Sequence, residues 1–102
     1  MSNKQLLAAA AKGELQWVKE FVEEGFDVYS VDSLGRNALH LAALHGQKEV
    51  MKWLILTMHM DINIADKIGM KAVHYAARNK NEVFPFLNRA ILYKDHNSQI
   101  DF

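Results

Sequence analysis

Apolar residues recur at spacings of three and four in three separate stretches of the chain. This spacing places them on one face of an α-helix, so each stretch predicts an amphipathic helix with one buried side. The three sets are Leu15, Val18, Phe21 and Val22; Val50, Met51, Leu54 and Ile55; and Val83, Phe84, Leu87 and Ile91. Each predicted helix needs an apolar neighbour against which this side can pack.

A shorter helix is predicted ahead of the second of these stretches. Residues 38–43 read ALHLAA, in which the alanine pair permits close approach of a neighbouring backbone. A D-x-x-G turn signal precedes this helix, and Gly46 breaks the chain after it. The segments DVYSVD (27–32) and DINIAD (61–66) are expected to run extended into the next turn. One structural unit is therefore a turn, a helix, a second turn, a second helix and an extended segment.

The unit is repeated with a period of 34 residues. The segments DSLGRNALHLAA (32–43) and DKIGMKAVHYAA (66–77) share six identities in twelve positions, where ordinary composition gives roughly one. Three units fit within a single domain at 1–102, over about 1–31, 32–65 and 66–99. The first unit lacks the Asp–Gly turn and the last loses the pattern toward its end, as expected for the terminal units of a stacked array.

These motifs resemble the ankyrin repeat family, whose unit of about 33 residues carries a G-x-T-P-L-H-x-A-A signature. Here the signature reads GRNALHLAA (35–43) and GMKAVHYAA (69–77). The G-A-D-V-N segment of the family appears as GFDVY (25–29) and MDIN (60–63). The resemblance covers nearly the whole chain. It implies an all-α fold, a stack of three helix-turn-helix units with short extended turns.

Two departures from the family pattern affect how the first helix of a unit begins. Asn37 and Lys71 stand where the family has threonine. Asn37 can still accept a hydrogen bond from the free N–H groups of the first helical turn, whereas Lys71 offers no acceptor, a loss of about 1 kcal/mol. The second unit also carries one extra residue ahead of Asp61.

Composition and charge exclude several classes of partner. Leu, Ile, Val and Phe supply 29 of 102 residues, well above the level of disordered chains. The net charge is zero, with 12 basic and 12 acidic residues, so the chain lacks the basic field that nucleic acid or an anionic membrane would require. There are no cysteines, which excludes disulfides and thiolate metal sites. No secretory signal or membrane span is apparent. We expect an intracellular location in the cytoplasm, with the nucleus left open.

The five histidines are the main candidates for chemistry. His40 and His74 occupy matched repeat positions, where the resemblance implies a hydrogen bond between helix start and turn. His45 follows His40 by five residues rather than the four that would share a helical face. His59 and His96 have no carboxylate or histidine at ligand spacing. We therefore expect no metal, no cofactor and no catalysis, since an enzyme acting through His40 or His45 has no further support.

The resemblance implies that a partner protein binds the turn tips and the exposed side of the first helices. The corresponding residues are Ser33, Leu34, Arg36, Leu44, His45, Lys67, Ile68, Met70, Arg78 and Asn79. Four of them, Leu34, Leu44, Ile68 and Met70, are apolar, and arginines lie among them, a composition typical of a binding hot spot. The alternative, that Leu34 and Ile68 merely pack tip against tip, stays open.

The expected function is a non-catalytic protein–protein interaction module. It would bind a partner protein of unknown identity through the turn tips and the concave face of the first helices, with little order lost on docking. The alternative is structural: a cap, or a self-associating fragment of a larger repeat protein, with the contact made by the third unit.

Overall fold

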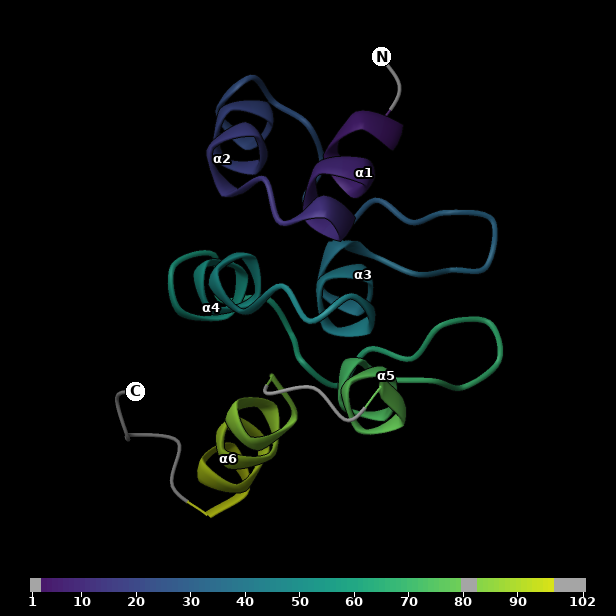
Figure 1. Ribbon diagram of the computed structural model, residues 1–102, viewed down its shortest axis with the longest axis vertical. Coiled ribbons are helices and arrows are strands. Elements are labelled where there is room, and N and C mark those ends of the chain that lie inside the picture. Colours follow the sequence, from purple (N-terminus) through teal and green to yellow (C-terminus); the bar gives the residue numbers. More distant parts are fainter. Residues whose placement is uncertain (1–2, 80–82, 97–102) are drawn as a thin grey trace.

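The computed structural model describes the backbone of residues 3–79 and 83–96, and the side chains of residues 3–78 and 84–92. This part of the chain forms helices and no strand. The helices are α1 (Lys4–Lys12), α2 (Leu15–Glu23), α3 (Ala38–Leu44), α4 (Lys48–Leu56), α5 (Ala72–Asn79) and α6 (Val83–His96). They stand in two columns, with α1, α3 and α5 in one and α2, α4 and α6 in the other (Figure 1). The all-α prediction is confirmed, and the helices pair as three helix-turn-helix units.

The first two helix pairs are each joined by a short turn at a glycine. Gly13 follows α1 with a φ of 79°, and Gly46 follows α3 with a φ of 70°. Each glycine donates its N–H to a carbonyl three residues earlier, Ala10 and Ala43 respectively. This left-handed conformation suits glycine because it has no Cβ. The predicted chain breaks at these glycines are confirmed.

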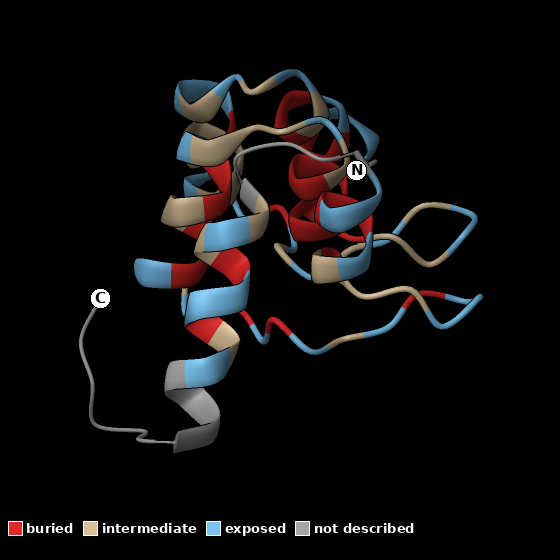
Figure 2. Cartoon of the chain, turned by 60° about the horizontal axis from the view of Figure 1, so that its bottom comes forward, coloured by how far each residue is buried: buried red, intermediate tan, exposed pale blue. Residues whose placement is uncertain are grey.

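The helix α3 lies at the centre of the core. All of Ala38–Ala43 is buried, and α1 packs on one side of it while α5 packs on the other. In the second column, the predicted apolar faces supply Val18, Val50, Met51, Leu54, Ile55 and Leu87 to the core. Figure 2 shows the buried positions gathered in the helical columns, with the connecting loops largely half-buried or exposed. The two columns therefore bury each other's apolar sides.

The starts of α3 and α5 differ in the way the sequence predicts. Asn37 caps α3: its Oδ1 accepts the His40 N–H at 3.0 Å, while His40 Nδ1 accepts the Asn37 N–H at 3.1 Å. At α5, His74 Nδ1 accepts the Lys71 N–H at 2.9 Å. The Lys71 side chain has no acceptor atom, so it cannot accept a hydrogen bond from the His74 N–H in the way that Asn37 accepts one from the His40 N–H. Only half of the reciprocal cap is therefore present at α5.

Replacing Lys71 by threonine should complete this cap. We expect Lys71→Thr to raise the free energy of unfolding by about 1 kcal/mol, because the threonine hydroxyl can accept an orphan N–H of the first helical turn. Urea denaturation followed by circular dichroism measures the change. An unchanged or lowered unfolding midpoint would contradict the prediction.

The segments between units project as two fingers on the side of α1, α3 and α5 (Figure 1). The sequence predicts extended chain here, but each segment begins with a turn. Asp27 Oδ1 accepts the Tyr29 N–H at 2.8 Å, and Asp61 Oδ1 accepts the Asn63 N–H at 2.9 Å. Aspartate favours such turns because its carboxylate bonds the backbone two residues further on. The prediction of extended chain is therefore wrong for the first residues of both segments.

Hydrogen bonds from one unit to the next hold the stack in register. Gln47 Nε2 donates to the Ala11 carbonyl at 2.9 Å, at the end of the helices where the glycine turns join each pair. The Asp61 N–H donates to Tyr29 Oη at 3.0 Å, where the fingers begin. The first two units are thus joined at both ends of their helices.

Candidate functional site

Each finger ends in a tight turn built on an aspartate. In the first finger, Asp32 Oδ1 accepts the N–H groups of Leu34 and Arg36, each at 2.9 Å. The Asp32 N–H donates to the Arg36 carbonyl at 3.0 Å and closes the turn. Gly35 takes a φ of 79°, which explains the glycine of the D-x-x-G motif. The first tip is therefore fixed by its own hydrogen bonds.

The second finger repeats this turn 34 residues later. Asp66 Oδ1 accepts the N–H groups of Ile68 and Met70 at 3.0 and 2.9 Å. The Asp66 N–H donates to the Met70 carbonyl at 2.9 Å, and Gly69 takes a φ of 83°. Because the two turns share one geometry, the Leu34 and Ile68 side chains occupy equivalent places at the two tips.

The two tips are joined through their backbones. The Lys67 N–H donates to the Leu34 carbonyl at 3.0 Å, and Lys67 Nζ donates to the Ser33 carbonyl at 2.9 Å. The apolar side chains stay largely in solvent, since Leu34 is 48% and Ile68 71% exposed. Contact between the fingers therefore does not require these side chains to be buried.

Close approach of the fingers makes Gly35 the more sensitive of the two tip glycines. A Cβ at Gly35 would lie 3.0 Å from the Lys67 backbone nitrogen, whereas one at Gly69 would meet nothing within 4 Å. We expect Gly69→Ala to cost about 1–2 kcal/mol of stability for its left-handed backbone alone. Gly35→Ala should cost more, because Lys67 must also move. Urea denaturation of the matched pair checks this, and equal losses would mean that the fingers separate freely.

His40 connects the start of α3 to the second finger. Its ring is 1% exposed, and its Nδ1 accepts a backbone N–H, so the proton of the neutral ring is on Nε2. Nε2–H donates to the Ile64 carbonyl at 2.9 Å. Burial lowers the pKa of His40 below its ordinary value, although the Ile64 carbonyl and the carboxylates of Asp66 and Asp32 favour the charged ring. His40 is thus a neutral structural link, in line with the role that the family resemblance implies.

Tyr75 and Asp66 form a buried polar pair beside His40. The Tyr75 hydroxyl donates to Asp66 Oδ2, and its ring meets the His40 ring edge-on at a centroid distance of 5.9 Å. Burial and the neighbouring carboxylate raise the pKa of Tyr75. Burial also acts to raise the pKa of Asp66, but hydrogen bonds from Tyr75, Met70 and Ile68 outweigh it and hold that pKa below its ordinary value. The second finger is therefore anchored to α5 as well as to the first finger.

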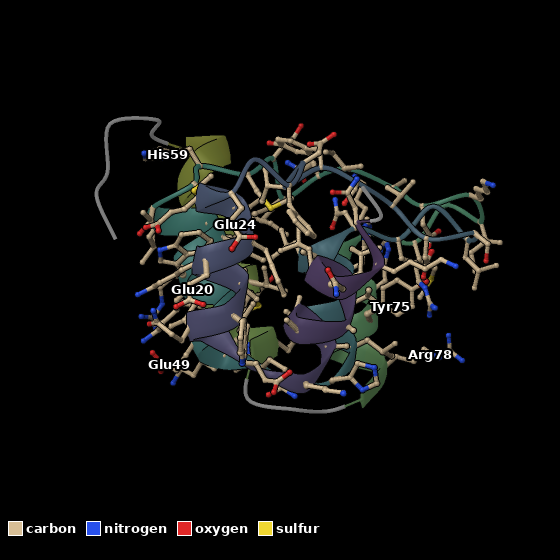
Figure 3. The ribbon with its side chains drawn as sticks, turned by 90° about the horizontal axis from the view of Figure 1, so that it is seen from above. Glu20, Glu24, Glu49, His59, Tyr75 and Arg78 are labelled. Carbon is tan, nitrogen blue, oxygen red and sulfur yellow. The ribbon has the colours of Figure 1, made fainter. Side chains whose placement is uncertain are left out.

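The ten residues predicted to bind a partner fall into three groups. Ser33, Leu34, His45, Lys67, Ile68 and Arg78 are exposed; Arg36, Leu44 and Met70 are half-buried; and the side chain of Asn79 lies outside the described residues. Leu44 and Met70 pack against the core, and Arg36 Nε forms an ion pair with Asp32 Oδ2 at 2.8 Å. Figure 3 shows Arg78 on the side of the fingers, while Glu20, Glu24 and Glu49 lie on the opposite side. We call the surface formed by these ten positions the inner face.

The described residues were compared with the requirements of a metal site and of a membrane span. Among them no group of three or more His, Asp or Glu side chains is arranged to hold a metal ion. None of the helices in the same part of the chain is long and apolar enough to cross a bilayer.

A family model described as ankyrin repeats in three copies matches residues 6–99. The chain belongs to the ankyrin repeat family. Ankyrin repeat modules generally bind proteins, and an ankyrin chain need not carry a catalytic group. The histidines that accept a backbone N–H at the helix starts, the glycine turns and the paired finger tips described above are thus those of an ankyrin stack.

Several known proteins are similar to this chain in sequence. Tyrosine-protein kinase Shark from Drosophila melanogaster is 39% identical over 79 residues, which cover 74% of this chain and 8% of the kinase. A putative ankyrin repeat protein from Rickettsia bellii is 32% identical over 80 residues, covering 78% of this chain and 44% of that protein. This chain thus spans less than half of either relative, and the activity named for the kinase does not transfer through so small a share.

A solved structure shares the ankyrin fold. It is the complex of the predatory endopeptidase Bd0816 from Bdellovibrio bacteriovorus with the immunity protein Bd3460. The match has a TM-score of 0.79 at 29% identity, and covers 88% of this chain and 47% of the other. The neighbour was therefore solved together with a protein partner.

Proposed function

We propose that this ankyrin stack is a non-catalytic module that binds a partner protein through its inner face. The observation that carries the proposal is the exposure of Ile68 and Leu34, 71% and 48%, on turns that hydrogen bonds already hold in place. Apolar side chains on fixed turns can be buried by a partner with little loss of conformational entropy. The protein-bound structural neighbour supports the same general role.

Site-specific photocrosslinking tests this proposal. A benzophenone amino acid is placed at Ile68 in one variant and at Leu56, 36% exposed on α4, in a matched control. In cells of the source organism, we expect position 68 to give discrete protein adducts that position 56 does not give. Adducts at both positions alike, or at neither, would contradict binding through the inner face.

A second candidate, self-association through the third unit, is favoured by the exposed end of the stack. His74 and Ala77 are exposed, whereas their counterparts in the second unit, His40 and Ala43, are buried. A second ankyrin stack could cover this end as α5 covers α3. Sedimentation velocity over a range of concentrations tests it: Ala77→Glu should abolish any dimer and Leu56→Glu should not. A monomer at every concentration would exclude this role.

A further inference from the structure

The inner face carries one sign of charge although the whole chain is neutral. Repeat register adds Ala11 and Lys12 of α1, the counterparts of Leu44 and His45, to the ten residues defined above. Among these twelve positions there is no carboxylate, and the cationic side chains are Lys12, Arg36, Lys67 and Arg78. Glu20, Glu24 and Glu49 lie on the far side of the molecule (Figure 3). The far side carries both signs, since α2 and α4 also hold Lys19, Lys48 and Lys52, so the single sign of charge is a property of the inner face.

The carboxylates of the two finger-tip turns are already engaged. Asp32 binds Arg36 and two backbone N–H groups, which hold its pKa below the ordinary value although burial acts to raise it. Asp66 is 8% exposed and is occupied by Tyr75 and two N–H groups. Because Asp32 and Arg36 neutralise each other, the surplus positive charge comes from Lys12, Lys67 and Arg78, which are all exposed.

The inner face combines apolar and positive groups. Leu34 and Ile68 stand at the finger tips, and Lys67 lies beside them with its Nζ on the Ser33 carbonyl. That bond uses one of three ammonium donors, so Lys67 can still bind an anionic group. Arg78, on α5, can bind a carboxylate with two parallel hydrogen bonds. A ligand that fits must therefore offer aliphatic side chains and carboxylates on one strip of surface.

We propose that the partner presents an acidic peptide segment with aliphatic side chains, which lies across the finger tips with its carboxylates toward Lys12, Lys67 and Arg78. The inference rests on the proposed function and specifies its ligand. A peptide is favoured over a nucleic acid because a phosphate backbone would leave Leu34 and Ile68 without apolar partners, and few cations are available to release counterions. Charge complementarity of this kind also speeds the encounter of the two molecules.

Selection from a displayed library of random peptides tests the inference. Peptides of about twelve residues reach about 40 Å when extended, which matches the 39 Å length of the molecule. With the full chain as bait, we expect the enriched peptides to carry net negative charge and aliphatic residues. Their binding should weaken severalfold between about 50 and about 300 mM salt, as screened charges do.

Two charge reversals of equal size locate the binding. Arg78→Glu should weaken the enriched peptides by about tenfold or more, whereas Lys48→Glu at the start of α4 should leave them unchanged. If the enriched peptides are neutral or basic but their binding is still weakened by Ile68→Asp, the proposal of an acidic ligand is wrong, while binding through the inner face is still supported. If neither Arg78→Glu nor Ile68→Asp weakens peptide binding, or if the selection enriches no peptide, both the acidic ligand and the proposed function are contradicted. Tighter binding of single-stranded DNA than of any selected peptide would also overturn the inference.

Discussion

Replacing His40 by alanine should lower the free energy of unfolding by about 3 kcal/mol. The change removes the acceptor of the Asn37 N–H and the donor to the Ile64 carbonyl, and both groups are left without a partner in the core. Each such loss costs about 1–3 kcal/mol. Thermal denaturation should show a fall in Tm of more than about 10 °C, as expected for a chain of this size.

His74 provides the matched control for this exchange. Its Nδ1 accepts the Lys71 N–H as His40 accepts that of Asn37, but the side chain is exposed and water can replace it. We therefore expect His74→Ala to cost less than about 1 kcal/mol. Equal losses in the two variants would mean that the bond to Ile64 contributes nothing.

The pH dependence of stability gives a separate check on His40. Because its pKa is lower in the folded protein than in the unfolded chain, the unfolded chain binds a proton first as the pH falls. Stability is then complete above the unfolded value of about 6.5 and declines as the pH falls toward the folded value. The wild type and His74→Ala should show this decline as the pH falls below about 6.5, and His40→Ala should lose that part of the slope. Asp32 and Asp66 face His40 but stay ionised there, since both pKa values lie below 3.8.

Alanine at Asp66 is the second large change that we expect. Loss of its carboxylate leaves the Ile68 and Met70 N–H groups and the Tyr75 hydroxyl without their acceptor. Hydrogen bonds to a charged group contribute about 1.5–3 kcal/mol each. Because water at the turn can replace part of these bonds, we expect the free energy of unfolding to fall by about 3 kcal/mol. Urea denaturation measures it, and crosslinking from Ile68 should fall as the second tip loses its shape.

Asp32→Ala is the matched comparison for Asp66. The same turn is opened, but the Asp32 side chain is partly exposed and its second oxygen binds Arg36 rather than a buried hydroxyl. We expect a loss of about 1 kcal/mol, because the freed N–H groups of Leu34 and Arg36 can reach water. A loss as large as that of Asp66→Ala would show that the burial of Tyr75 adds nothing to the second turn.

Short-range rules account for the elements that could be predicted from the sequence. The spacing of apolar residues predicts the buried faces of α2 and α4. The glycines predict the turns at Gly13 and Gly46, and the side-chain acceptor of Asn37 predicts the start of α3. Each of these follows from residues within one or two helical turns. The repeat of 34 residues then supplies the stacking, because equivalent segments must bury the same faces.

The link between Tyr75 and Asp66 could not be predicted in this way. In repeat register Tyr75 replaces Leu41, which suggests one apolar residue in place of another. Its hydroxyl reaches Asp66 only because α5 packs beside the base of the second finger. One signal was present in the sequence. Met70 replaces Arg36, so Asp66 lacks the arginine that pairs with Asp32. This indicates that a different side chain donates to Asp66. Burial of Asp66 and the half-buried state of Leu44 and Met70 likewise depend on packing between units.

Among the described helices of the first column, α3 packs against both α1 and α5, whereas α5 has α3 as its neighbour in that column. Coupling in such an array runs between nearest neighbours, so the middle unit is clamped twice and the last unit once. Fraying should therefore begin at α5 and α6, where amide hydrogens would exchange soonest. A ligand laid across both finger tips would restrain that end, and its concentration would then regulate how long the last unit stays folded.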